Sequence, residues 1–280
     1  MHLENLLCKY PNLRSQILQI VGEHLNYSKE QITAHFNEIT VSPARLNIIN
    51  KTISDLKKGV PLPYCILKKC FYNIDLKVNK YVLIPRCETE ILAEKAIKIA
   101  KKIRRGNVLD VGTGSGNIII VINKAVGNHL NYYAVDKSPE ALAVARLNAK
   151  SQKLNNIRFY KSDLFSNTKL PNKFDLIVAN LPYLRSNYLK SLPQNLANNL
   201  KAEPQIALDG GSDGLEIIRK FLFSLGKKMH NEAVAIIEIG DNQKRKVVQI
   251  CRNLNFKTKL IKDLNGFDRF VVIRKRTRQA

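Results

Sequence analysis

The sequence of 280 residues contains no tryptophan, two methionines, and 23 acidic residues against 46 lysines and arginines. Its five cysteines form no Cys-x-x-Cys pair, which argues against a disulfide framework and against a zinc site. Its five histidines are scattered, which argues against a histidine-based metal site. No stretch approaches the roughly 18–20 uncharged apolar residues of a membrane helix. The first ten residues include Glu4 and Lys9 and lack the apolar run of a secretory signal. We therefore expect a cytoplasmic protein with reduced cysteines and no membrane contact.

The net charge of +23 is the unusual feature of the composition. Such a charge favours anionic partners and predicts contact with the ribosome or tRNA through a basic surface. Abundant lysine, asparagine and isoleucine indicate instead a compositional bias with no selection for binding. The basic residues are spread along the chain, apart from a cluster within 274–278. Both interpretations remain open at this point.

The N-terminal part of the chain has the periodicity of helices. Leu46, Ile49, Ile53 and Leu56 form one apolar stripe, and Ser28 with Gln31 has the spacing of a capping box. We predict a bundle of four helices in a docking domain over residues 1–75. A β-hairpin linker is predicted over 76–90, where the run 81–84 is β-prone.

From residue 91 to residue 280, strand and helix patterns alternate, which predicts an α/β domain with a mostly parallel sheet. The predicted strands cover residues 108–111, 132–135, 157–160, 174–179, 233–239, 256–261 and 269–273. Asn265-Gly266 lies between the last two strands, so we expect these to form a hairpin at one end of the sheet.

A glycine-rich turn follows the first strand of this domain. Glycine permits positive φ and close approach of a ligand, and the next helix supplies free amides at its N-terminus. Asp136 ends the next strand, 20 residues after Gly116, where a carboxylate can accept both hydroxyls of a ribose. The candidate cofactor-binding residues are Asp110, Gly112, Thr113, Gly114, Ser115, Gly116 and Asp136.

Two cofactors fit this pattern, a dinucleotide and S-adenosylmethionine. The dinucleotide fingerprint has its third glycine at the sixth position, where this chain has Asn117. Asp110 before the loop suits a cationic sulfonium amino acid and would repel a pyrophosphate. S-adenosylmethionine is therefore favoured. Asp163 and Leu164, after a later strand, are candidates to accept the adenine amino group and to pack on its ring, although such an Asp is more often a turn residue.

The segment Asn180-Leu181-Pro182-Tyr183 follows a strand at the end of the sheet where open α/β folds bind ligands. The Asn180 carboxamide and the Leu181 carbonyl offer two acceptors, Pro182 stiffens the turn, and Tyr183 offers a flat face. Together they can hold a planar –NH₂ group, either an amide or an aromatic amine. We predict that these four residues bind the substrate and act in catalysis, and that Asn180 also contacts the cofactor.

The chain resembles the HemK/PrmC family, which methylates a glutamine side-chain nitrogen in peptide release factors. The resemblance covers essentially the whole chain and rests on several motifs in order. These are 84–90 (IPRCETE), the glycine loop, 135–139 (VDKSP), 180–183 (NLPY), 203–215, 239–243 and 262–269.

The resemblance implies a Rossmann-like class I methyltransferase fold with a seven-stranded, mostly parallel sheet. It implies that S-adenosylmethionine is held by Gly112–Gly116, Asp136 and the region near Leu164. It further implies that Asn180–Tyr183 bind the glutamine of the release factor's Gly-Gly-Gln loop, and that the N-terminal helices dock that protein.

Two residues depart from the family's usual pattern. Leu181 stands where the family has proline, which leaves the backbone acceptor in place, and Cys87 stands where proline is common. Asn-Leu-Pro-Tyr also occurs in adenine-N6 rRNA dimethyltransferases of the KsgA type. An adenine-N6 methyltransferase acting on rRNA, tRNA or DNA is therefore the alternative, and a non-catalytic RNA-binding factor is a second one.

Overall fold

A computed structural model of the protein describes residues 1–191 and 200–276. Among these residues the chain forms two compact units, which are described separately. The first unit holds residues 1–68 and 200–202, and the second holds 69–191 and 203–276. Within the described part of the chain, no helix is both long enough and apolar enough to cross a bilayer.

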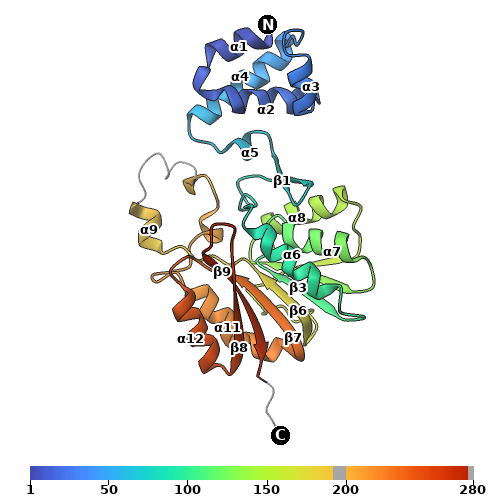
Figure 1. The fold of residues 1–280 in the computed structure, drawn as a ribbon, viewed down its shortest axis with the longest axis vertical. Coiled ribbons are helices and arrows are strands. Elements are labelled where there is room, and N and C mark those ends of the chain that lie inside the picture. Colours follow the sequence, from blue (N-terminus) through green and yellow to red (C-terminus); the bar gives the residue numbers. More distant parts are fainter. Residues whose placement is uncertain (192–199, 277–280) are drawn as a thin grey trace. The chain divides into compact units, whose positions relative to one another are not determined.

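The first unit is a small helical bundle, as predicted. It contains α1 (Leu3–Lys9), α2 (Arg14–Leu25), α3 (Lys29–Ala34), α4 (Pro43–Lys57) and the single turn α5 (Leu62–Cys65), with a 3₁₀ turn at Pro11–Leu13 (Figure 1). Its core is almost fully buried, with Leu6, Ile17 and Ile49 among its members. The capping box is confirmed, because the Gln31 amide donates to Ser28 Oγ at 3.2 Å and the Ser28 amide to Gln31 Oε1 at 2.8 Å.

The β-hairpin lies earlier in the chain than the predicted span 76–90. Its strands are β1 (Lys68–Phe71) and β2 (Ile74–Lys77). The two residues between the strands, Tyr72 and Asn73, both have positive φ, 49° and 60°, as a tight two-residue hairpin turn requires. The β-prone run at 81–84 forms no strand, and instead contributes to a cavity described below.

The second unit contains a seven-stranded sheet in the order β5-β4-β3-β6-β7-β9-β8. Its strands are β3 (Asn107–Val111), β4 (Asn131–Asp136), β5 (Ile157–Lys161), β6 (Phe174–Ala179), β7 (Met229–Glu238), β8 (Phe256–Lys262) and β9 (Asp268–Lys275). The first five strands pair in parallel, and β9 pairs antiparallel with both β7 and β8. The predicted class, strand number and closing hairpin are confirmed.

Helices cover both faces of this sheet (Figure 1). The helices α6 (Thr89–Ala100), α7 (Asn117–Val126) and α8 (Pro139–Ser151) pack in one apolar cluster, and α11 (Glu216–Lys228) and α12 (Lys244–Asn253) pack in the other. Adjacent residues of one strand belong to opposite clusters, as Val108 and Leu109 of β3 do. The strands after β3 are added first on one side of it, as β4 and β5, and then on the other side, as β6 and β7. The order therefore reverses between β3 and β6, and open α/β folds bind ligands at the carboxyl ends of the strands at such a reversal.

Candidate active site

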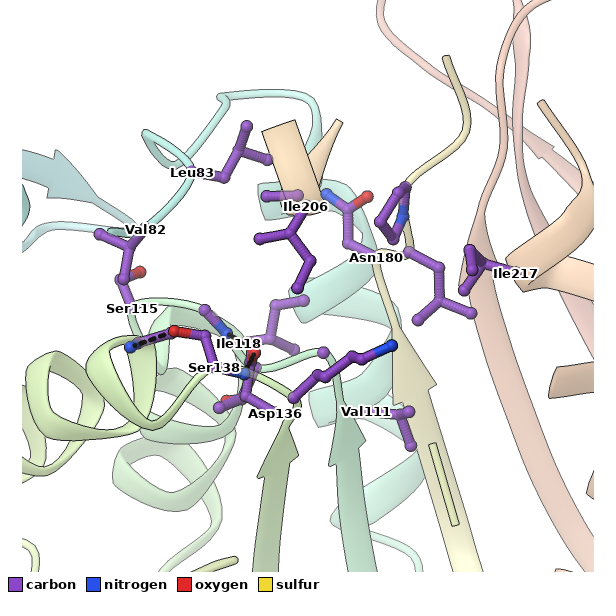
Figure 2. Close-up of a pocket in the computed structure, with 18 of the residues that line it drawn as sticks. Val82, Leu83, Val111, Ser115, Ile118, Asp136, Ser138, Asn180, Ile206 and Ile217 are labelled. Atoms are coloured by element: carbon purple, nitrogen blue, oxygen red, sulfur yellow. Dashed lines mark hydrogen bonds between the residues drawn. The ribbon is translucent and has the colours of Figure 1, made fainter. Parts of the chain in front are cut away.

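A cavity of about 390 Å³ lies at the carboxyl ends of β3, β4 and β6. This volume falls in the range of small-molecule and cofactor sites. The residues that line it come from segments far apart in the sequence: 81–89, 111–118, 136–141, 162–164, 180–182 and 205–217. Figure 2 shows Asp136 and Ser138 on one side of this space and Asn180 and Ile217 on the other.

The glycine loop forms one wall of the cavity. Gly112 and Gly114 have positive φ of 72° and 55°, and the Gly112 and Thr113 amides both donate to the Val135 carbonyl at 2.9 Å. Gly116 is not among the described lining residues, and its predicted contact with the cofactor stays a prediction. A Cβ at 116 would come to 3.2 Å from that of Ala145 in α8, so glycine here allows close packing of the loop on that helix.

A fully buried asparagine that sequence reasoning missed supports the glycine loop from behind. Asn148 in α8 donates to the Ser115 carbonyl at 2.8 Å and exchanges two hydrogen bonds with the Lys77 backbone, at 2.7 and 2.9 Å. It thereby fixes both the loop and the end of β2. An asparagine inside a helix gives no sequence signal of this role, because its partners lie 33 and 71 residues away.

Asp136 lies at the end of β4 and lines the cavity, as predicted. Its Oδ2 accepts the Gly114 amide at 2.8 Å and its Oδ1 accepts the Ser138 amide at 2.9 Å, so the loop, the strand and the start of α8 are joined by one carboxylate. Burial raises the pKa of Asp136, and the two backbone amides oppose that rise. Each oxygen retains lone pairs for a diol, in keeping with the predicted contact to a ribose.

Asp110 is fully buried behind the glycine loop and is not among the described residues that line the cavity. Its Oδ2 accepts the Thr113 hydroxyl at 2.7 Å. Burial raises the pKa of Asp110 to about 7. A cation bound at the loop would favour the ionised form, so the interaction predicted for Asp110 is through the loop rather than by direct contact.

The two residues predicted to hold an adenine, Asp163 and Leu164, both line the cavity. Asp163 Oδ2 forms an ion pair with Lys137 Nζ at 3.1 Å, and its side chain is 60% exposed. Leu164 has a positive φ of 53°. Their positions agree with the prediction, while their contact with an adenine stays a prediction.

Asn180 lies directly after β6, at the other side of the cavity from Asp136 (Figure 2). Its Nδ2 donates to Thr89 Oγ1 at 3.2 Å. Neither Asn180 Oδ1 nor the Leu181 carbonyl accepts a hydrogen bond from residues 1–191 or 200–276. Leu181 and Pro182 both line the cavity, and the 3% exposed Leu181 side chain packs beside Gly112. Two residues that line the cavity therefore each have a carbonyl oxygen with no described donor, and the contact of these oxygens with a substrate stays a prediction.

Tyr183, the last residue of the predicted substrate-binding segment, is held by two residues from a distant part of the chain. It is not among the described residues that line the cavity, and contact of its ring with a substrate stays a prediction. Its hydroxyl donates to Glu238 Oε1 at 3.1 Å, and its carbonyl accepts Gln243 Nε2 at 2.9 Å. Burial, with the Glu238 charge, raises the pKa of Tyr183. These partners lie 55 and 60 residues from Tyr183, which the local sequence does not reveal.

A buried carboxylate ties two walls of the cavity together. Glu203 is 3% exposed, and its Oε2 accepts the Ile84 amide at 3.1 Å while its Oε1 accepts Arg86 Nη2. Arg86 and the residues after Glu203, among them Ile206, line the cavity. The sequence indicated Glu203 only through the family resemblance. The structure shows that its carboxylate joins the segment after 203 to Ile84 and Arg86.

The comparisons with known proteins place this site in a family. A family model described as "Methyltransferase domain" matches residues 102–265. A release factor glutamine methyltransferase from Thermodesulfovibrio yellowstonii is 35% identical over 92% of this chain and 91% of its own length. The chain belongs to the release factor glutamine methyltransferase family. A second member, from Dictyoglomus turgidum, is 43% identical over 72% of this chain and 71% of its own length.

A solved structure supports the fold assignment for this family member. The catalytic domain of hMettl16, determined in complex with an RNA hairpin, matches with a TM-score of 0.59 at 15% identity, over 78% of this chain and 81% of that one. At this identity the likeness shows the methyltransferase fold alone. The glycine loop, Asp136 and a cavity of cofactor size all fit S-adenosylmethionine, which agrees with the prediction from the loop.

Proposed function

We propose that this protein transfers a methyl group from S-adenosylmethionine to the side-chain amide nitrogen of the glutamine in the Gly-Gly-Gln loop of a peptide release factor. The observation that carries the proposal is the pair of unused acceptors, Asn180 Oδ1 and the Leu181 carbonyl, in the cavity that the glycine loop also lines. Relatives named for this activity over most of their length support it.

The chemistry explains why two acceptors are needed. An amide nitrogen is a poor nucleophile because its lone pair is delocalised into the carbonyl. Two oxygens that each accept a hydrogen bond from one of its two N–H groups hold the nitrogen in line with the methyl group and raise the electron density on the nitrogen. No strong base is required before attack, since the proton becomes acidic only once the nitrogen carries the methyl. The bound cofactor supplies an electrophilic methyl on a sulfonium centre.

The reactive end of the cavity also contains apolar side chains. Leu83 and Ile206 line it together with Asn180, and Figure 2 shows all three around the same space. Their surfaces suit the aliphatic part of a glutamine side chain.

The helical unit is the proposed docking module for the release factor. Every described residue that lines the cavity belongs to the second unit. The helical unit has a core of its own, which supports a separate role in recognition. The net charge of +23, from 46 basic and 23 acidic residues, supports a further contact with the ribosome or tRNA. Free cysteines throughout the chain support a reducing cytoplasm as the compartment.

The direct test is a transfer assay with labelled S-adenosylmethionine. One reaction contains a purified release factor, a second contains the same factor with the glutamine of its Gly-Gly-Gln loop changed to alanine, and a third contains rRNA and tRNA. We expect label only in the first. Label in RNA and none in protein would overturn the proposal in favour of the adenine-N6 alternative. Absence of S-adenosylmethionine binding in calorimetry would instead favour a non-catalytic factor.

A further inference from the structure

Three segments of the second unit meet at one buried carboxylate. Glu238, at the end of β7, is 2% exposed. Its Oε2 accepts the hydroxyl of Thr89 at 2.7 Å, and its Oε1 accepts the hydroxyl of Tyr183 at 3.1 Å. Thr89 begins α6 and is itself 1% exposed. Both oxygens of Glu238 are thus occupied by donors that come from distant parts of the chain.

The direction of these hydrogen bonds determines how the next residue is oriented. An ionised carboxylate only accepts, so the single hydroxyl proton of Thr89 is committed to Glu238. Thr89 Oγ1 can then only accept from Asn180, and the end of the Asn180 amide that faces it must be the NH₂ group, as observed at 3.2 Å. The other end of the amide, Oδ1, is consequently the end left without a partner among the described residues, on a residue that lines the cavity.

This orientation matters because the two ends of an asparagine amide are similar in shape and opposite in hydrogen bonding. With Oδ1 toward the cavity, Asn180 accepts a hydrogen bond from an N–H group of the substrate amide. With the amide turned over, Nδ2 would face that nitrogen as a second donor, and the interaction would be repulsive. The chemistry of the proposed reaction therefore depends on which way one amide points.

We propose that Glu238 and Thr89 are positioning residues that fix the orientation of the Asn180 amide for methyl transfer. This inference rests on the proposed function for its kinetic consequence, while the orientation itself can be tested without a substrate. Glu238 also accepts from Tyr183, three residues after Asn180, so the same carboxylate holds one end of the Asn180–Tyr183 segment directly and the other end through Thr89.

The protonation state of Glu238 is part of this arrangement. A protonated Glu238 can donate its own proton to Thr89, which frees the threonine hydroxyl to donate to Asn180 and turn the amide. Burial raises the pKa of Glu238, while the Thr89 and Tyr183 hydrogen bonds and the charge of Arg269 on β9 lower it, and Glu88 beside Thr89 raises it. At acidic pH, where Glu238 becomes protonated, the Asn180 amide would therefore lose its fixed orientation.

The kinetic test compares Thr89→Val, which removes the hydroxyl at nearly constant shape, with Thr89→Ser, which retains it. We expect Thr89→Val to lower kcat on the release factor by about 100-fold, the size of a small misplacement at a reacting centre. Its affinity for S-adenosylmethionine should stay at the wild-type value, and Thr89→Ser should keep most of the wild-type kcat. Thr258→Val in β8, the same chemical change away from the cavity, is the matched control.

The substrate-free test follows the side-chain amide of Asn180 by NMR, with ¹⁵N-labelled asparagine and assignment by Asn180→Gln. We expect its NH₂ resonances to shift as the pH is lowered, and this shift to be lost in both Thr89→Val and Glu238→Gln. Resonances that do not respond to either substitution would overturn the relay even if the release factor is methylated. Conversely, a wild-type protein that shows the shift but methylates no release factor would contradict the proposed function alone. A Thr89→Ser protein as slow as Thr89→Val would also contradict the relay.

Discussion

Arg86 and Glu203, 117 residues apart, form a partly buried ion pair between two walls of the active-site cavity. The Glu203 side chain is 2% exposed and that of Arg86 is 37% exposed. The same carboxylate also accepts the Ile84 amide. The relationship explains how the segment 81–89 and the segment after 203, which have no strand pairing with each other, come to face one another across a cavity.

Removal of this carboxylate should loosen the cavity. We expect Glu203→Ala to lower the free energy of unfolding by about 1–3 kcal/mol, because the buried Ile84 amide loses its acceptor. The exposure of Arg86 keeps the ion pair's own share small. Chemical denaturation measures the effect, with Glu38→Ala, which removes an exposed partner of His35, as the control. Equal stability of Glu203→Ala and the control would show that the pair does not hold the walls.

Asn180→Ala should separate catalysis from cofactor binding. We expect kcat to fall by about 10²–10³-fold, the loss typical of one preorganised polar group at a reacting centre. The dissociation constant of S-adenosylmethionine should change little, since Asn180 lies away from Asp136 (Figure 2). Steady-state kinetics with a release factor and calorimetry with the cofactor measure the two quantities. A parallel loss in both would contradict the role assigned to Asn180.

Asp136→Ala should have the opposite effect. The loss of a carboxylate that holds both the glycine loop and the start of α8 should weaken S-adenosylmethionine binding by about 10–100-fold, the value of a charged hydrogen bond. At saturating cofactor, kcat should stay near the wild-type value. Calorimetry followed by kinetics at high cofactor concentration distinguishes the two. Unchanged affinity would remove Asp136 from the cofactor site.

Gly210→Ala should displace the loop that carries Asn180. A Cβ at 210 would come within 2.7 Å of the Gly214 carbonyl and 2.8 Å of both the Pro182 carbonyl and Tyr183 Cα, all of them backbone atoms. We expect a loss of kcat of about 100-fold. Gly226→Ala in α11 is the control, since its Cβ meets only the Phe256 ring at 3.5 Å, and alanine there should raise stability by up to about 1 kcal/mol. Wild-type kcat in Gly210→Ala would contradict this account.

The buried Asp110 should make stability depend on pH. Its pKa rises from 3.8 to about 7 on folding, so the folded state binds its proton more tightly. Its contribution to stability is therefore complete below pH 3.8 and is lost as the pH rises through about 7. We expect Asp110→Asn, which retains an acceptor for Thr113, to be more stable than wild type at alkaline pH by about 1–3 kcal/mol.

Urea denaturation of wild type and Asp110→Asn at several pH values measures this difference. Asp136 and Glu238 also have raised pKa values and remain in both proteins. The difference between the two curves therefore reports the titration of Asp110 together with its interaction with the Asp136 charge. Parallel curves for the two proteins across the acidic to alkaline range would show that Asp110 does not titrate as described.

The parts of the site that the sequence predicted lie next to strand ends. Gly112 and Asn180 follow β3 and β6 directly, and Asp136 is the last residue of β4. The alternating apolar pattern of each strand shows where it ends. The topology of a parallel sheet then brings those ends together. The sequence could therefore predict that these three residues lie close together, because the prediction needs only the strand ends and the topology of the sheet and no knowledge of side-chain contacts.

The supporting residues were not predictable for the same physical reason. Thr89 and Glu238 are 149 residues apart, and Asn148 and Lys77 are 71 apart, and nothing in the local pattern distinguishes them from ordinary polar residues. The β-hairpin was placed too late, because the positive φ of Tyr72 is uncommon for an aromatic residue and gives no turn signal. The buried partner of the Tyr183 hydroxyl, Glu238, lies 55 residues away and was not predictable for the same reason.

The most direct measurement is mass-spectrometric mapping of a release factor after incubation with this protein and S-adenosylmethionine. We expect one added methyl group, on the side-chain nitrogen of the glutamine in the Gly-Gly-Gln loop, and far less of it in the same time when Asn180→Ala replaces the wild-type protein. A methyl group on any other residue, or an unmodified release factor beside a methylated RNA, would contradict it.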